Sequence, residues 1–209
     1  RGAGDLLGGE QSGFINEIGF ETYQKILEEA IEELKENEFK TLFEDQEKPL
    51  EKNYVKEVQI DTDFEILFPD DYINVVNERL LLYNELSAIK NEETLMQFKK
   101  NLEDRFGKIP PEGVELLSTL RLKWLASKMG LERLIIKNKK CVGYFLSDQQ
   151  SDFYQNPVFN QILLGVQKQT EKYSMKEKQT RNGLRLILVL DQVHSIEKLL
   201  EQLNNLLND

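Results

Sequence analysis

The residues best suited to chemistry stand within the first thirteen positions of this 209-residue chain, a segment that holds five glycines. Glycine is used where the backbone must adopt a positive φ or lie close against another group. Arg1 and Gln11 flank the glycines and offer a forked cation and an amide to a phosphate backbone. The segment therefore predicts a loop shaped by contact with a partner. The alternative is a surface loop between two structural elements.

Known nucleotide-binding motifs fit this loop poorly. It lacks the lysine followed by serine or threonine that defines a Walker A loop. Gly2-Ala3-Gly4 resembles the start of a dinucleotide fingerprint, but Leu7 stands where that pattern has its third glycine. A nucleotide-binding enzyme that uses Gly2 to Gly8 remains an alternative interpretation.

The other candidate groups favour structural roles. His194 is the only histidine and Cys141 the only cysteine, so a His/Cys metal cluster cannot form. We expect His194 at the start of a helix and Cys141 in the core, because free cysteine is usually buried. Asp61, Asp63 and Glu65 alternate along a strand pattern and indicate a solvated face rather than a cation site.

Composition limits the class of protein. A hydrophobic fraction of 40% and a charged fraction of 31% are typical of a soluble globular protein. A net charge of −10 argues against a broad phosphate-binding surface. The sequence has no membrane-length apolar run and no visible signal peptide. The single cysteine excludes an internal disulfide and favours a reducing cytoplasm.

Hydrophobic periodicity divides the chain into three parts. An amphipathic helix over 20–34 follows the loop, and residues 37–56 form a charged linker that contains Pro49. We therefore predict that residues 1–36 are the end of one domain and that residues 57–209 form another. The second opens with a strand over 58–68, where apolar and polar residues alternate.

Three helices in a row are predicted next. The first follows Pro69-Asp70-Asp71, and the second is centred on Phe98. The third runs from about Glu112 to Met129 and ends at a left-handed Gly130 cap. The stripe expected to be buried on the first helix comprises Ile73, Val76, Leu80, Tyr83 and Leu86.

The remainder is mixed. Strands are predicted over 134–136 and 142–146, followed by a helix from Pro157. A hairpin joins 173–178 to 184–190 through Asn182-Gly183, and a last helix covers 196–207. The fold class is therefore α+β: a loop and amphipathic helix, then a domain of packed helices with a small, mainly antiparallel sheet.

Two stretches are similar to one family. Residues 1–23 read Arg-Gly-Ala-Gly-Asp-Leu-Leu-Gly-x-x-Gln-Ser-Gly-x-Ile-x-x-x-Gly-Phe-x-x-Tyr and resemble the segment just past helicase motif VI in RecG-type superfamily 2 DNA translocases. The resemblance is strongest to the bacterial transcription-repair coupling factors. The second stretch resembles their C-terminal domain. Its motif residues are Tyr72, Arg79, Tyr83, Asp104, Arg105, Phe106, Gly107 and Pro110.

The resemblance implies a C-terminal fragment of a DNA translocase. In this family the loop belongs to a translocation motif, in which Arg1 and Gln11, with Gly2, Gly4 and Gly8, would couple ATP hydrolysis to movement along double-stranded DNA. The parent protein would bind ATP and magnesium, displace stalled RNA polymerase and recruit the repair protein UvrA in the cytoplasm.

The resemblance also implies a regulatory role for the second part of the chain. The C-terminal domain would mask the UvrA-binding domain of the same protein. The fragment itself would hold no catalytic residue, metal or cofactor. A free-standing adaptor domain without motor function is the alternative.

Overall fold

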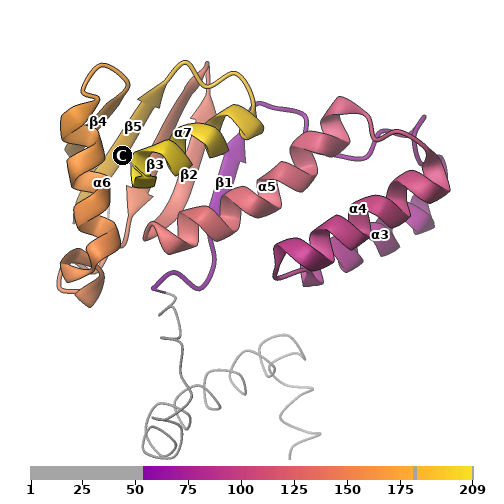
Figure 1. The fold of residues 1–209 in the computed structure, drawn as a ribbon, viewed down its shortest axis with the longest axis horizontal. Helices are drawn as coiled ribbons and strands as arrows, with labels where there is room; N and C mark the ends of the chain where they lie inside the picture. Colours follow the sequence, from indigo (N-terminus) through magenta and orange to yellow (C-terminus); the bar gives the residue numbers. More distant parts are fainter. Residues whose placement is uncertain (1–53, 181–182, 209) are drawn as a thin grey trace, which may run out of the picture. The chain divides into compact units, whose positions relative to one another are not determined.

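The computed structural model of the chain describes residues 54–180 and 183–208 (Figure 1). The chain divides into two compact units, Arg1–Lys52 and Asn53–Asp209, and all described residues belong to the second. The predicted helix over 20–34 and most of the predicted linker lie outside the described residues. The predicted domain limits stay predictions.

The described elements follow the predicted order with one addition, the short 3-10 helix η2. They are β1 (Gln59–Thr62), α3 (Val76–Ala88), α4 (Glu92–Phe106), α5 (Pro111–Lys128), β2 (Leu131–Lys137), β3 (Lys140–Phe145), η2 (Asp152–Gln155), α6 (Pro157–Lys168), β4 (Tyr173–Thr180), β5 (Gly183–Asp191) and α7 (Ile196–Asn208). The predicted α+β class is confirmed.

The five described strands form one sheet in the order β1-β2-β3-β5-β4. The pairs β2–β3, β3–β5 and β4–β5 are antiparallel, and β1 pairs with β2 in parallel. Helices α5, α6 and α7 cover one face of this sheet (Figure 1). The prediction of a mainly antiparallel sheet is therefore confirmed, with β1 as its one parallel strand.

Strand β1 is shorter than the predicted strand over 58–68. The hydroxyl oxygen of Thr62 accepts a hydrogen bond from the backbone N–H of Phe64 at 3.0 Å, which turns the chain out of the sheet. Phe64 and Ile66 still pack against the core beside the sheet, and Phe68 is buried further on. The period-two pattern thus reports alternating burial, although the backbone leaves the ladder after four residues.

The described residues enclose two cores, and α5 contributes to both. The sheet core lies between the sheet and the helices that cover it, and α5 supplies Leu122 and Ala126 to it. The helical core joins α3, α4 and the first half of α5, which supplies Leu117. A helix with buried residues around its circumference is typical of such a central position.

The start of α7 is fixed from two sides. The Ser195 hydroxyl accepts a hydrogen bond from the backbone N–H of Lys198 at 3.0 Å, and the Glu115 carboxylate of α5 accepts one from Ile196 at 2.7 Å. Burial raises the pKa of Glu115 above its ordinary value, although the Ile196 hydrogen bond opposes this. His194 is exposed directly before this helix, as predicted.

Gly130 confirms the predicted left-handed cap after α5, with a φ of 68°. A Cβ atom at this position would lie 2.3 Å from Cζ of the buried Phe153. Gly107 also has a positive φ, 81°, but a Cβ there would meet nothing within 4 Å. Substitutions at the two glycines therefore distinguish the cost of backbone strain from the cost of a steric clash with Phe153.

We predict that Gly130→Ala lowers the free energy of unfolding by about 3 kcal/mol, because overpacking of Phe153 adds to the left-handed strain. Gly107→Ala carries backbone strain alone, at a φ of 81° and a ψ of −163° that only glycine adopts readily, and should cost about 1–2 kcal/mol. Urea denaturation of both variants measures the difference. Equal losses would contradict the close packing of Gly130 against Phe153.

Candidate functional site

The predicted loop residues Arg1, Gly2, Gly4, Gly8 and Gln11 lie outside the described residues. Their role in translocation therefore stays a prediction. The predicted motif residues of the C-terminal domain, by contrast, all fall within the described range. The structure brings most of them together where α3, α4 and α5 meet.

Four aromatic rings anchor this junction. The Phe68 ring stacks on Tyr83, with centroids 5.4 Å apart, and the Tyr72 ring lies 5.9 Å from that of Phe106. The Tyr83 hydroxyl accepts a hydrogen bond from the backbone N–H of Phe68 at 2.9 Å. The Tyr72 hydroxyl donates one to the Gly107 carbonyl at 3.0 Å. The junction thus ties the chain before α3 to α3 itself and to the end of α4.

Arg79 holds the turn that leads into α3. Its guanidinium donates a hydrogen bond to the Ile73 carbonyl and lies 2.9 Å from the Asp70 carboxylate. The Arg79 side chain is only 14% exposed. This arginine therefore fixes the entry to the helix and leaves little of its charge for a ligand.

The end of α4 holds the remaining motif residues. Arg105 forms an ion pair with Glu78 of α3, and its guanidinium carbon lies 4.8 Å from the centroid of the Phe106 ring. Gly107 ends the helix, and Pro110 is the N-terminal cap residue of α5. Asp104 is exposed. The motif is thus chiefly a scaffold that orients α3, with Asp104 and Arg105 at its surface.

The outer surface of α3 is unusually apolar. We define the α3 face as Val76, Leu80 and Leu81, whose exposed fractions are 58%, 55% and 69%. Val75 and Leu67, which precede the helix, are also exposed large apolar residues. Clustered exposed apolar side chains of this kind mark interaction surfaces.

The α3 face corrects the predicted buried stripe. Val76 and Leu80 were expected in the core, but both point outward, and Leu82 is buried in their place. The predictions of burial for Ile73 and Leu86 are confirmed. Leu82 and Leu86 belong to the helical core, and Tyr83, which was also expected to be buried, packs against it partly buried.

A pocket of about 250 Å³ lies between α3 and α4, next to the α3 face. Its apolar lining comes from Leu82, Phe98 and Leu102, and its rim carries Glu85, Asn101, Asp104 and Arg105. Leu81 lies one helical turn before Glu85, so the pocket and the α3 face share an edge. Together they form a surface with an apolar centre and a charged rim, as protein-binding sites have.

Among the described residues, Cys141 is not placed for nucleophilic chemistry. Cys141 is fully buried, and burial raises its pKa to about 12, so the thiolate needed for nucleophilic attack is not formed. No group of three or more His, Cys, Asp or Glu residues within the described ranges is placed to hold a metal ion. Across the same part of the chain, no helix combines the length and apolarity that a membrane span requires.

The acidic strand face is solvated, as predicted, and two of its carboxylates also make contacts. Asp61 pairs with Arg133 of β2, and the Arg133 hydrogen bond holds the pKa of that carboxyl below its ordinary value. The Asp63 carboxylate accepts a hydrogen bond from the backbone N–H of Asn138 at 2.9 Å. Both carboxylates therefore help to dock β1 on the neighbouring hairpin.

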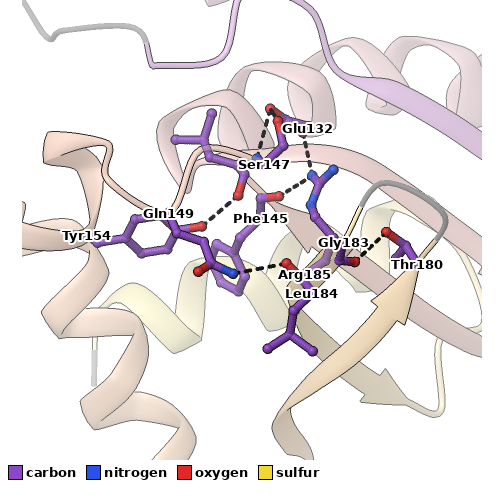
Figure 2. Close-up of polar contacts among 10 residues, drawn as sticks. Glu132, Phe145, Ser147, Gln149, Tyr154, Thr180, Gly183, Leu184 and Arg185 are labelled. Atoms are coloured by element: carbon purple, nitrogen blue, oxygen red, sulfur yellow. Dashed lines mark hydrogen bonds and ion pairs between the residues drawn. The ribbon is translucent and has the colours of Figure 1, made fainter.

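A second polar cluster, which the sequence did not reveal, lies at the end of the sheet (Figure 2). Arg185 of β5 donates hydrogen bonds to the Glu132 carboxylate and to the Phe145 carbonyl. Glu132 in turn accepts from the backbone and hydroxyl of Ser147, both at 3.2 Å. Because Arg185 and Glu132 are 53 positions apart, no local pattern points to their pairing.

This cluster has a structural function. The Gln149 side chain donates to the Leu184 carbonyl at 3.0 Å, and the Tyr154 hydroxyl donates to the Leu146 carbonyl at 2.7 Å (Figure 2). The first contact fastens the loop after β3 to the β4–β5 hairpin, and the second fastens the start of that loop to η2. Among the described residues, the α3 face with its adjoining pocket is therefore the better candidate for a functional site.

Comparisons with known proteins identify relatives of the second part of the chain. Residues 62–156 match the family described as TRCF domain. The chain is 35% identical over 176 residues to the transcription-repair-coupling factor of Escherichia coli strain K12, an alignment that covers 84% of this chain and 14% of that protein.

Two further relatives carry the same name. The protein from Haemophilus influenzae is 37% identical over 134 residues, an alignment that covers 64% of this chain and 11% of that protein. The protein from Staphylococcus epidermidis is 30% identical over 198 residues, an alignment that covers 90% of this chain and 16% of that protein. The chain therefore spans a small part of the length of each relative.

A solved structure shows the same fold. The crystal structure of the C-terminal domain of transcription-repair coupling factor superposes with a TM-score of 0.53 at 18% identity. The match covers 73% of this chain and 94% of that one.

The orientation of α3 can be tested with two neighbouring leucines. Leu82 is 5% exposed and Leu81 is 69% exposed. We predict that Leu82→Ala lowers the free energy of unfolding by about 3 kcal/mol, because it leaves a cavity in the helical core. Leu81→Ala should change it by no more than about 0.5 kcal/mol. Thermal or urea unfolding distinguishes them, and the reverse ranking would contradict the phase of α3.

Proposed function

This chain belongs to the transcription-repair-coupling factor family, and we propose that it is the C-terminal part of an ATP-dependent double-stranded DNA translocase. The parent protein would remove stalled RNA polymerase from DNA and recruit nucleotide excision repair in the cytoplasm. ATP and magnesium would be bound by parts of the parent outside this chain. The basis for this proposal is the relationship to the named coupling factors, together with the sequence of the first 23 residues.

Within the parent, the described domain would act as an autoinhibitory module. It would cover the UvrA-binding domain of the same protein in the resting state and release it when repair begins. The single observation that carries this role is the α3 face, where large apolar side chains stand exposed on a rigidly held helix. Burial of two leucines at such a surface contributes about 2 kcal/mol each, enough to favour a closed state.

Charge at the edge of the α3 face would add specificity. Glu85 and Asp104 rim the adjoining pocket, and Arg105 beside them is held by Glu78. A partner surface with a central apolar residue and a basic rim complements this arrangement. Rim charges of this kind guide register and association rate more than they raise affinity, and so suit a contact that must open again.

The role of the glycine-rich loop completes the proposal. Arg1 and Gln11 would transmit ATP hydrolysis in the parent to movement along DNA, with Gly2, Gly4 and Gly8 giving the backbone its close approach. The support for this is the ungapped sequence pattern from Arg1 to Tyr23 alone.

The autoinhibitory role predicts a gain of function. In the intact parent protein, the double substitution Leu80→Asp and Leu81→Asp should weaken the closed state and raise UvrA affinity about tenfold or more. Isothermal titration of the parent with UvrA measures this affinity. The substitutions should leave the fold intact, because both side chains are already exposed.

Leu164→Asp on α6 is the matched control, since Leu164 is 56% exposed but lies on a different helix. It should leave UvrA affinity unchanged. If the double variant bound UvrA no better than the unaltered parent, the α3 face would not be the masking surface.

The loop yields a separate prediction. In the intact parent, Arg1→Ala or Gln11→Ala should preserve ATP hydrolysis and abolish movement along DNA. Hydrolysis is followed by phosphate release, and movement by displacement of a third DNA strand from a triplex. Loss of both activities together would contradict a coupling role, because it would place these residues in nucleotide binding or hydrolysis.

A further inference from the structure

The sheet has a second face, opposite the one that α5, α6 and α7 cover (Figure 1). Side chains alternate along each strand, so the residues next to the buried Cys141, Leu134 and Leu188 point to this second face. None of the described residues, 54–180 and 183–208, belongs to a helix that covers it. We call this surface the open sheet face. Its central side chains are Ile135, Val142, Tyr144, Ile187 and Val189.

These five side chains form one continuous apolar patch. In register, Ile135 pairs with Val142, which pairs with Val189, while Tyr144 pairs with Ile187. None of the five contributes to the sheet core or to the helical core. Ile187 is nevertheless only 7% exposed, because its neighbours on the strands lie around it. The open sheet face is therefore an apolar surface independent of both cores.

Cations border the patch on the β4 side. Lys176 stands opposite Ile187, and Lys178 stands opposite Arg185. The Lys178 ammonium lies 5.3 Å from the centroid of the Tyr144 ring and donates a hydrogen bond to the Tyr144 hydroxyl at 2.8 Å. At the other end of the patch, Lys137 pairs in register with Lys140.

Two carboxylates on this face are already engaged. Asp61 pairs with Arg133, and Asp191 lies 3.1 Å from the Lys140 ammonium. Lys137, Lys176 and Lys178 thus add positive charge beyond these pairs. The chain as a whole carries a net charge of −10, so this border is a local reversal of sign. Electrostatic complementarity favours an acidic partner here.

The surface is hollowed at one end. A groove of about 1210 Å³ runs from the segment before β1 to the end of the β4–β5 hairpin. Arg133, Tyr144, Lys178 and Arg185 line it together with residues 54–57 and Glu132. Its concave form gives a bound segment contact on more than one side.

The aliphatic floor distinguishes between classes of partner. Single-stranded nucleic acid binds where successive bases stack on several aromatic rings. The five central side chains of the open sheet face include one ring, Tyr144, and Lys178 already lies over it. A protein segment with aliphatic side chains matches the isoleucines and valines directly, and acidic side chains at its edges match the lysines.

We propose that the open sheet face binds an acidic amphipathic helix of a partner protein. The helix would set its apolar side on Ile135, Val142 and Val189 and its carboxylates against Lys176 and Lys178. Helices are the natural cover for this surface, since three of them already pack on the opposite face of the same sheet. The site is distinct from the α3 face, which lies on another element.

The test uses the full 209-residue chain and a synthetic helical probe. The probe is built from glutamate, leucine and alanine, with its leucines on one side. Backbone amide NMR spectra recorded during titration should shift at the five patch residues. Lys176→Glu with Lys178→Glu should weaken binding about tenfold. Lys99→Glu with Lys100→Glu, the matched control on α4, should leave it unchanged.

Two other probes test whether the open sheet face binds a basic helix or single-stranded nucleic acid instead. A peptide with lysine in place of glutamate should bind at least about tenfold more weakly, because it meets like charge. Oligothymidine should not shift the patch amides. The proposal is overturned if the acidic probe does not bind, if its shifts map to α3, or if either alternative probe binds equally well. Concentration-dependent shifts without any probe would assign the face to a second copy of the chain and also overturn it.

Discussion

Helix α5 contributes buried side chains to two separate cores, and the rest of the described structure depends on that sharing. Leu117 packs with α3 and α4, while Leu122 and Ala126 pack under the sheet. Gly113 permits close approach near the start of the helix, where a Cβ would lie 2.7 Å from the side chain of Ile109. Because one rigid helix serves both cores, the position of α3 is linked to the sheet through packing rather than through a flexible joint.

The packing of α3 against α5 explains the structural role of the motif residues. The polar atoms of Tyr72, Tyr83 and Arg79 contact backbone groups and Asp70. They hold α3 at a fixed rotation against α4 and α5. The consequence is that Leu80 and Leu81 must face outward. An apolar surface presented by so constrained a helix is suited to a partner that docks without rearranging the domain.

Local patterns predicted much of the fold because they report burial and turns. The predicted hairpin is confirmed by the antiparallel pairing of β4 with β5, and Gly130 ends α5 as expected. The same patterns failed where tertiary contacts decide. Thr62 turns the chain out of a strand that alternation alone would continue, and α3 packs Leu82 into the helical core where the pattern had placed Leu80.

Long-range pairing was beyond such reasoning. The parallel pairing of β1 with β2 joins segments more than seventy positions apart, as in the pair Ile60–Leu134. The pairing of Arg185 with Glu132 depends on the same kind of contact. The same holds for the candidate site. The motif residues could be identified from the sequence, but the exposure of the α3 face could be seen only in the structure.

The most direct test of an autoinhibitory domain is the UvrA affinity of the intact parent protein with and without residues 57–209. Equilibrium binding of purified UvrA to the two forms, under the same conditions, gives the comparison. The account predicts tighter binding by the shortened form, since the surface that masks the UvrA-binding domain has been removed. Equal or weaker binding by the shortened form would contradict it.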